Sequence, residues 1–256
     1  MPLINRVLSK VSKGEPTFGV WITISHPEVT EILSNLPFDW FVFDMEHAPL
    51  TIKDVEFLMM PLRGTDIVPI VRVPWNDFVI IKQVLDLGAE GVIVPWINTR
   101  EEAEKAVKAM KYPPEGIRGT GPRRCVMYGV RDAKEYFERW NESFILLTQI
   151  ETVEGVKNIE EIIDVDGVTG SFIGPSDLSA SLGAYRDFKN PAYIEALNKV
   201  LTATLKVGKI AGIMSNSPED AAEKLRMGFN FITLSHDTRY LIEGAKLFLK
   251  AVGIPK

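Results

Sequence analysis

Polar and ionisable residues with catalytic potential stand at the ends of several short apolar runs in this chain. They are Asp44-Met45-Glu46-His47, Val71-Arg72-Val73, Gln149-Ile150-Glu151 and Gly174-Pro175-Ser176-Asp177. If the runs are parallel strands of a barrel, their carboxyl ends meet at one face, where such barrels carry their active sites. The sequence therefore predicts that these side chains converge.

Glu151 and Asp177 are the two carboxylates that this arrangement would bring together. Facing carboxylates share either a proton or a cation. Because the available ligands are oxygens, the expected cation is a hard divalent ion such as Mg²⁺ or Mn²⁺. The structural alternative is that each carboxylate only caps the helix that follows it. Their joint occurrence on adjacent runs favours a metal site.

Arg72 and His47 add a cation and a proton carrier. Arginine is almost never buried without a partner, so Arg72 pairs either with a strand-end acid or with a charged ligand. Imidazole suits proton transfer at neutral pH, although a histidine at a strand end commonly serves as a structural hydrogen-bonding residue. The turn led by Gly174 exposes backbone N–H groups, which suits a carboxylate or a phosphate.

Schiff-base chemistry needs a lysine at the carboxyl end of a strand. Lys209 comes nearest, but it precedes its run and would lie at the wrong face. Carbonyl chemistry at this site is therefore predicted to be assisted by a metal.

The elements that must position these groups alternate along the chain. Eight strand-like runs are each followed by an amphipathic stretch of helical length, and most are continuously apolar, as buried parallel strands are. The runs are 18–23, 40–44, 67–73, 91–95, 144–150, 168–173, 209–214 and 229–234. Capping patterns at Thr51, Thr99, Asn190 and Ser217 mark helix starts. The pattern predicts an α/β fold, a (β/α)₈ barrel, with an open eight-stranded sheet as the alternative.

Composition bounds the class of protein. The 256 residues have a net charge of −5, which disfavours nucleic acid as a partner. One (β/α)₈ barrel needs about 250 residues, so we expect a single catalytic domain over 1–256, with a long active-site or interface loop at 112–130. No membrane span or signal peptide is expected, and the single Cys125 forms no internal disulfide, so we expect a cytoplasmic protein.

Taken together, the motifs resemble the HpcH/HpaI aldolase family, metal-dependent class II pyruvate aldolases related to citrate lyase β-type enzymes. The likeness runs in order over nearly the whole chain. The matching segments are 38–40, 44–49, 71–77, 112–119, 149–152 and 172–179.

This resemblance implies a phosphoenolpyruvate/pyruvate-type (β/α)₈ barrel that cleaves a 4-hydroxy-2-oxo acid into pyruvate and an aldehyde. It also implies a divalent metal cofactor (Mg²⁺, Mn²⁺ or Co²⁺) and a homo-oligomer, either a hexamer or a trimer. The implied roles are metal ligation by Glu151 and Asp177, substrate binding by Gln149, Gly174, Ser176, Asp177 and Arg72, charge stabilisation by Arg72, acid–base catalysis by His47 and support of His47 by Asp44.

The family also pairs its histidine with an acid that maps to Asp86. The segment Leu85-Asp86-Leu87-Gly88 is typical of a helix end, which places Asp86 far from the carboxyl ends of the strands. A neighbouring subunit that supplied this acid to His47 would resolve the conflict. Apolar residues of the last helix, among them Leu241, Leu247 and Phe248, also predict contact with another subunit.

The sequence departs from the family pattern at Met45, at 121–125 and at Ser235-His236-Asp237-Thr238, places expected to face the aldehyde half of the substrate. Three other functions stay open. They are oxaloacetate decarboxylation through the same enolate, a citrate-lyase-like reaction on an acyl-CoA whose phosphates would meet the 118–124 loop, and non-catalytic ligand binding.

Overall fold

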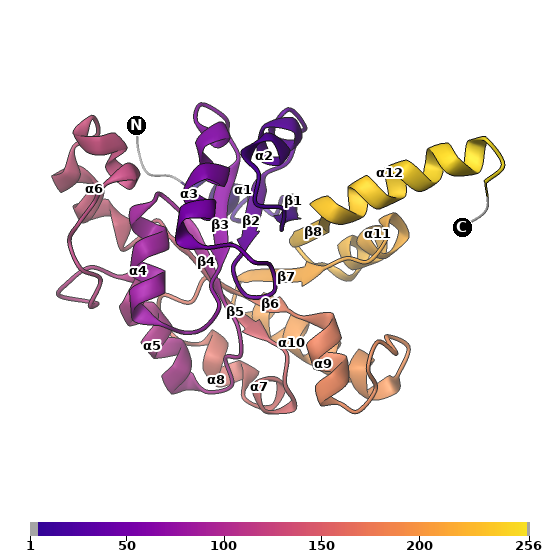
Figure 1. Cartoon of the computed structure of the whole chain (residues 1–256). Coiled ribbons are helices and arrows are strands. Elements are labelled where there is room, and N and C mark those ends of the chain that lie inside the picture. The colour runs from indigo at the N-terminus through magenta and orange to yellow at the C-terminus, as the bar shows by residue number, and fades with distance from the viewer. Residues whose placement is uncertain (1–4, 255–256) are drawn as a thin grey trace.

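In the computed structural model, which describes residues 5–254, eight parallel strands close into a barrel in the order of the sequence (Figure 1). The strands are β1 (Thr17–Ile22), β2 (Trp40–Asp44), β3 (Val68–Arg72), β4 (Gly91–Val94), β5 (Ile145–Ile150), β6 (Gly170–Ile173), β7 (Ile210–Met214) and β8 (Phe231–His236). Because β8 pairs with β1, the predicted (β/α)₈ barrel is confirmed and the open sheet is excluded.

One helix precedes β1, and the others follow the strands and surround the barrel (Figure 1). They are α1 (Arg6–Val11), α2 (Pro27–Ser34), α3 (Ile52–Met59), α4 (Phe78–Asp86), α5 (Arg100–Met110), α6 (Ala133–Trp140), α7 (Val153–Lys157), α8 (Ile159–Ile163), α9 (Pro175–Ser181), α10 (Pro191–Lys206), α11 (Pro218–Met227) and α12 (Asp237–Ala251), with short 3₁₀ turns η1 (Met60–Leu62) and η2 (Arg124–Gly129). The side chains of Thr51, Thr99, Asn190 and Ser217 cap α3, α5, α10 and α11, as their patterns predict.

Large aromatic side chains fill the interior of the barrel. Trp40 and Phe231 stack with their ring centroids 3.7 Å apart. A Cβ at position 19 would lie 2.2 Å from the Trp40 ring, so only glycine lets β1 pass this indole. Further along β1, Trp21 packs against Phe172 at 5.2 Å. This filling closes the barrel below its carboxyl end, where the side chains become polar.

All eight predicted strands agree with the structure to within two residues at each end, and the eighth is displaced as a whole, since β8 runs on to His236 beyond its predicted end at Leu234. The pairing of β1 with β8 shifts register between Gly19 and Trp21. Ser235, in this stretch of β8, has a φ of 84°. Such a bulge interrupts the two-residue alternation from which strand ends are predicted.

The long 112–130 connection lies at the amino end of the barrel, because it leads from α5 towards β5. Arg118 is fully buried, with its guanidinium 4.4 Å from the Tyr112 ring and 4.6 Å from the Trp140 ring, and it pairs with Asp86 at 2.8 Å. Arg124 donates to two backbone carbonyls, those of Met59 and Leu87. Within one chain the connection is therefore anchored to α4, at the end opposite the polar strand ends.

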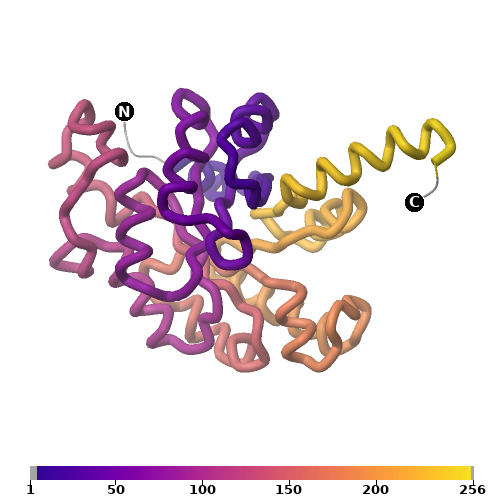
Figure 2. Tube along the Cα trace, in the orientation of Figure 1, coloured from indigo at the N-terminus to yellow at the C-terminus, as the bar shows by residue number. Residues whose placement is uncertain are grey.

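The last helix, α12, extends away from the barrel (Figures 1 and 2). Its apolar side chains include Leu247 and Phe248, which are 69% and 77% exposed. No helix within residues 5–254 is long and apolar enough to cross a membrane. Residues 1–4 and 255–256 lie outside the described residues. The predicted domain over 1–256 includes both of these segments, and the expected absence of a signal peptide concerns the first.

Candidate active site

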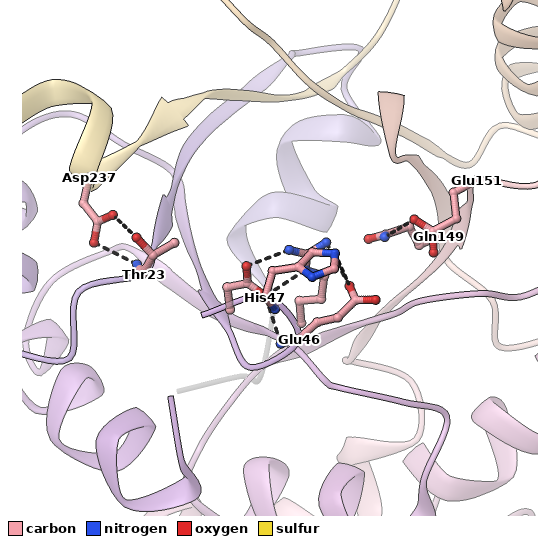
Figure 3. Close-up of polar contacts among 8 residues, drawn as sticks. Thr23, Glu46, His47, Gln149, Glu151 and Asp237 are labelled. Atoms are coloured by element: carbon pink, nitrogen blue, oxygen red, sulfur yellow. Dashed lines mark hydrogen bonds and ion pairs between the residues drawn. The ribbon is translucent and has the colours of Figure 1, made fainter. Parts of the chain in front are cut away.

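Polar side chains gather at the carboxyl ends of β2, β3, β5 and β6. Figure 3 shows Glu46 and His47 facing Gln149 and Glu151, with Thr23 and Asp237 further round the same rim. The register pairs Asp44 directly with Arg72 and places the end of β5 beside the end of β6. The structure thus brings together the strand-end residues of all four motifs.

Asp44 and Arg72 are joined by two hydrogen bonds in this cluster. The Asp44 carboxylate accepts from Arg72 Nε at 2.9 Å and from Arg72 Nη2 at 2.6 Å. It also accepts from the backbone N–H groups of Glu46 at 3.0 Å and His47 at 3.3 Å. Burial works against its charge, but these bonds hold the pKa of Asp44 below its usual range. Asp44 therefore fixes both the Arg72 guanidinium and the turn that carries His47.

Arg72 stays charged although it is buried. Its Nη1 lies 2.9 Å from Glu46 Oε2, and its guanidinium lies 5.2 Å from the centre of the Trp21 ring. Burial opposes the charge, yet Asp44, Glu46 and Glu151 raise the pKa of Arg72. A guanidinium carries five N–H groups, so the contacts to Asp44 and Glu46 leave others to bind a ligand.

Negative charge exceeds positive charge in this cluster. Burial raises the pKa of Glu46 to about 7, and the charges of Asp44 and Asp177 act in the same direction. Burial likewise raises the pKa of Glu151 to about 7, with Glu46 and Asp177 adding to the shift. The carboxylates of these four residues therefore repel one another electrostatically around the Arg72 guanidinium. A divalent cation would offset this excess and let the carboxylates ionise.

Glu151 is held in a fixed position. Its Oε1 accepts from the Trp96 backbone N–H at 2.9 Å, and its Oε2 accepts from Gln149 Nε2 at 2.5 Å. A Cβ at Gly174 would lie 2.7 Å from Glu151 Oε2, so the carboxylate rests against the backbone that begins α9. Thr152, rather than Glu151, caps α7, which removes the capping alternative for Glu151.

Glu151 and Asp177 suit a metal that keeps open coordination positions. Asp177 lies in the first turn of α9, and its charge acts on Glu151. Among residues 5–254, no three His, Cys, Asp or Glu side chains form a ready-made metal cage. Two carboxylate ligands with the remaining positions left to substrate and water fit Mg²⁺ or a similar hard cation, which seldom has an all-protein cage.

His47 lies at the rim with 62% of its side chain exposed, and its Nε2 is 4.0 Å from Glu46 Oε2. Asp86 is not brought to it within one chain, since it ends α4 at the amino end of the barrel and pairs with Arg118. Lys209 precedes β7 and donates to the carbonyls of Ile163 and Val165, away from this site.

Sequence reasoning assigned no role to Glu46, Trp21 or Trp96. Glu46 stands two residues after Asp44, a spacing that repeats along one strand face and could have marked it. Trp21 gives no such signal, because a tryptophan in an apolar run resembles any core residue. Trp96 contributes only its backbone N–H, which the type of its side chain does not indicate.

Known proteins are similar to this chain in sequence and in fold. A sequence model of the family described as HpcH/HpaI aldolase/citrate lyase matches residues 17–244. The chain is 38% identical over 234 residues to the 5-keto-4-deoxy-D-glucarate aldolase of Escherichia coli O139:H28, with 91% of each chain covered.

Two crystal structures are also similar to this chain. An HpcH/HpaI aldolase/citrate lyase family protein from Burkholderia cenocepacia J2315 superposes with a TM-score of 0.93 at 30% identity, covering 97% of this chain and 99% of that one. An HpcH/HpaI aldolase from Desulfitobacterium hafniense DCB-2 has a TM-score of 0.87 at 27% identity, covering 97% and 98%.

The barrel, its site and these relatives define an enzyme of the lyase class with aldolase activity. The chain belongs to the HpcH/HpaI aldolase/citrate lyase family.

Proposed function

We propose that this enzyme is a metal-dependent aldolase that reversibly cleaves a 4-hydroxy-2-oxo acid into pyruvate and an aldehyde. The observation that carries the proposal is the buried Arg72, held by Asp44 and Glu46 opposite Glu151 at the carboxyl ends of the strands. This arrangement suits a reaction in which negative charge develops on a carbonyl oxygen.

Glu151 and Asp177 would hold the divalent ion, which we propose to be Mg²⁺, Mn²⁺ or Co²⁺. When bound, the ion supplies Lewis-acid polarisation of the 2-oxo group and neutralises carboxylate charge. The excess of buried carboxylates around Arg72 supports this assignment, as does the close approach of Gly174 to Glu151.

The pyruvyl half would lie between α9 and Arg72. No side chain caps the first turn of α9, so the backbone N–H groups of Ser176 and Asp177 can receive the substrate carboxylate. The buried Gln149 Oε1 has no partner within the described chain, and its amide borders the same place. The N–H groups of Arg72 not used by Asp44 and Glu46 would face the 2-oxo oxygen.

In the cleavage direction, His47 accepts the proton of the 4-hydroxyl group, directly or through a water molecule. The C3–C4 bond then breaks and C4 becomes the aldehyde carbonyl. The electron pair of that bond passes to C3 and spreads to the 2-oxo oxygen, where Arg72 stabilises the enolate. Asp44 keeps Arg72 in place throughout. Return of this proton from His47 to C3, directly or through a water molecule, completes pyruvate, and synthesis runs through the same steps in reverse.

We further propose a homo-oligomer, a hexamer or a trimer, located in the cytoplasm. The exposed apolar side chains of α12 support a second copy of this chain as their partner, because this helix extends beyond its own barrel (Figure 2). Asp86 would assist His47 only across such an interface, given its place at the amino end of the barrel.

Reaction on an acyl-CoA is less well supported. Arg118 is buried against aromatic rings and Arg124 donates to backbone carbonyls, so neither guanidinium is displayed for phosphates. Decarboxylation of oxaloacetate would use the same enolate and the same residues. The two reactions can be distinguished because only the aldol reaction requires an aldehyde.

A substrate screen tests the proposal. The chelator-treated protein is assayed with pyruvate and a panel of aldehydes, with and without added Mg²⁺, Mn²⁺ or Co²⁺, and with oxaloacetate alone. We expect 4-hydroxy-2-oxo acid products that require both pyruvate and metal. Turnover of oxaloacetate without any aldehyde-dependent product would contradict the proposal.

A further inference from the structure

The loop between β4 and α5 contains a strained residue beside the site. Trp96 has a φ of 55°, in the left-handed region that residues other than glycine rarely adopt. Its side chain is 43% exposed, so burial of the indole does not compensate for this conformation. The backbone N–H of Trp96 donates to Glu151 Oε1 at 2.9 Å. Strained backbone persists where the surrounding structure holds it, and it gathers at functional sites.

The side chain of Asn98 closes the turn that contains Trp96. Its Nδ2 donates to the Trp96 carbonyl oxygen at 3.2 Å, and its Oδ1 accepts from Thr152 Oγ1. A carbonyl oxygen can only accept, so the nitrogen of the amide must face Trp96 and its oxygen must face Thr152. Thr152 follows Glu151 directly in the chain and is the N-cap of α7. One amide therefore joins the loop after β4 to the end of β5.

The main chain of Asn98 is fixed as well. Its N–H donates to Glu102 Oε2 at 2.7 Å, within the capping box of α5, and its carbonyl oxygen accepts from Asn158 Nδ2 at 2.8 Å. The preceding residue, Ile97, donates its N–H to the Gln149 carbonyl oxygen at 3.4 Å. Both the side chain and the backbone of Asn98 thus bind the surrounding elements, which is the support that a strained neighbour requires.

The orientation of the Glu151 carboxylate depends on two donors. Trp96 supplies one to Oε1, and Gln149 Nε2 supplies the other to Oε2 at 2.5 Å, as Figure 3 shows for Gln149. Hydrogen bonds of this kind orient a metal ligand, and their loss typically costs 10- to 100-fold in metal affinity. If Trp96 relaxed to a negative φ, its N–H would turn away from Oε1 and the carboxylate would keep only the donor from Gln149.

We propose that Asn98 is a positioning residue for Glu151, and that it acts by holding Trp96 in the conformation that directs its N–H at the carboxylate. The inference rests on the proposed function, in which Glu151 binds a divalent ion. The hydrogen bonds of the Asn98 side chain reach Trp96 and Thr152 rather than Glu151, so its effect on the metal site is indirect.

Variants of the turn separate this role from a general contribution to stability. Asn98→Ala removes the amide, and Trp96→Val places a β-branched side chain where a positive φ is most costly. Trp96→Gly is made alone and together with Asn98→Ala, because glycine adopts a positive φ without support. Asn190→Ala is the matched control, since Asn190 caps α10 by accepting from the Ala192 N–H at 3.0 Å.

Binding of Mn²⁺ to each chelator-treated protein is measured by calorimetry, and its melting temperature is recorded. Deuterium exchange into the pyruvate methyl group is followed as the Mn²⁺ concentration is raised. Asn98→Ala and Trp96→Val should each weaken Mn²⁺ binding about tenfold and raise the Mn²⁺ concentration for half-maximal exchange by the same factor. Trp96→Gly alone should bind Mn²⁺ as wild type does, and added to Asn98→Ala it should recover most of the lost affinity. Asn190→Ala should melt at a lower temperature but bind Mn²⁺ normally.

Wild-type affinity in Asn98→Ala, or a loss that Trp96→Gly does not recover, would overturn the positioning role and leave the aldolase function standing. If Asn98→Ala did not fold, the comparison of Trp96→Val with Trp96→Gly would decide the question, because equal affinities in these two variants would equally overturn the role. Chelator-treated wild type that bound no Mn²⁺ and whose exchange did not respond to it would overturn both this inference and the proposed metal-dependent function.

Discussion

Replacing Asp44 with asparagine isolates the contact on which the site depends. The substitution keeps the shape of the side chain, but it removes the charge and turns one acceptor oxygen into a donor amide. That amide would oppose one of the two Arg72 donors now at 2.9 Å and 2.6 Å. Breaking a buried ion pair by removing one partner costs about 3–5 kcal/mol.

The expected loss lies near the lower end of that range, because Arg72 keeps Glu46 as a partner at 2.9 Å. For a chain of this size, about 3 kcal/mol corresponds to a fall of roughly 6–12 °C in melting temperature. Activity should fall by about 100-fold, as when one donor to a developing oxyanion is misplaced.

Thermal unfolding and aldol cleavage are measured on Asp44→Asn and on the control Asp77→Asn. Asp77 also accepts two backbone N–H groups, at the start of α4, but it lies on the surface, where asparagine caps equally well. The control should resemble wild type. If Asp44→Asn melted within about 2 °C of wild type and kept its activity, the argument that Asp44 holds Arg72 would be refuted.

Three further predictions concern the metal site and the last helix. Gly174→Ala places a Cβ 2.7 Å from Glu151 Oε2, so metal affinity by calorimetry should fall at least about tenfold while the fold is kept. The metal-free protein should lose stability as pH rises from about 4.5 to about 7, because the unfolded chain ionises Glu46 and Glu151 before the folded chain does. Added Mg²⁺ or Mn²⁺ should therefore raise the melting temperature more at pH 8 than at pH 5. Phe248→Glu should reduce the mass measured by light scattering, because it charges the exposed apolar face of α12.

Each of these predictions has a distinct control or contrary result. Gly119→Ala should bind metal normally, since its added Cβ meets only the flexible Lys82 side chain, at 3.4 Å. A metal-induced stabilisation equal at both pH values would show that the ion does not act on the two glutamates. An oligomer unaffected by Phe248→Glu would remove α12 from the interface, and Leu36→Glu, at an exposed site after α2, controls for the added charge.

The regular parts of the fold could be predicted from the sequence because they rest on local patterns. Continuous apolar runs mark strands buried on both faces, and the capping boxes at Thr51 and Thr99 form as their spacing predicts. The convergence of Arg72 and Glu151 follows from the same topology, because the carboxyl ends of all strands in such a barrel meet at one face.

The remaining features depend on contacts that sequence spacing does not encode. The bulge at Ser235 is one residue of extra backbone, and its place is decided by how Asp237 anchors α12 to β1. Trp21 borders the site because its ring lies 5.2 Å from the Arg72 guanidinium, a contact between two strands that are not neighbours in the barrel. The placement of Asp86 against Arg118 likewise depends on how the 112–130 connection folds back on α4.

Exchange of the pyruvate methyl protons for deuterium tests the central claim most directly, because it reports enolisation without any aldehyde. We predict that the chelator-treated wild type exchanges slowly, that added Mg²⁺ or Mn²⁺ restores exchange, and that Glu151→Gln abolishes both the exchange and its response to metal. Exchange at the wild-type rate in Glu151→Gln would contradict the assignment of Glu151 as a ligand of the ion that promotes the enolate.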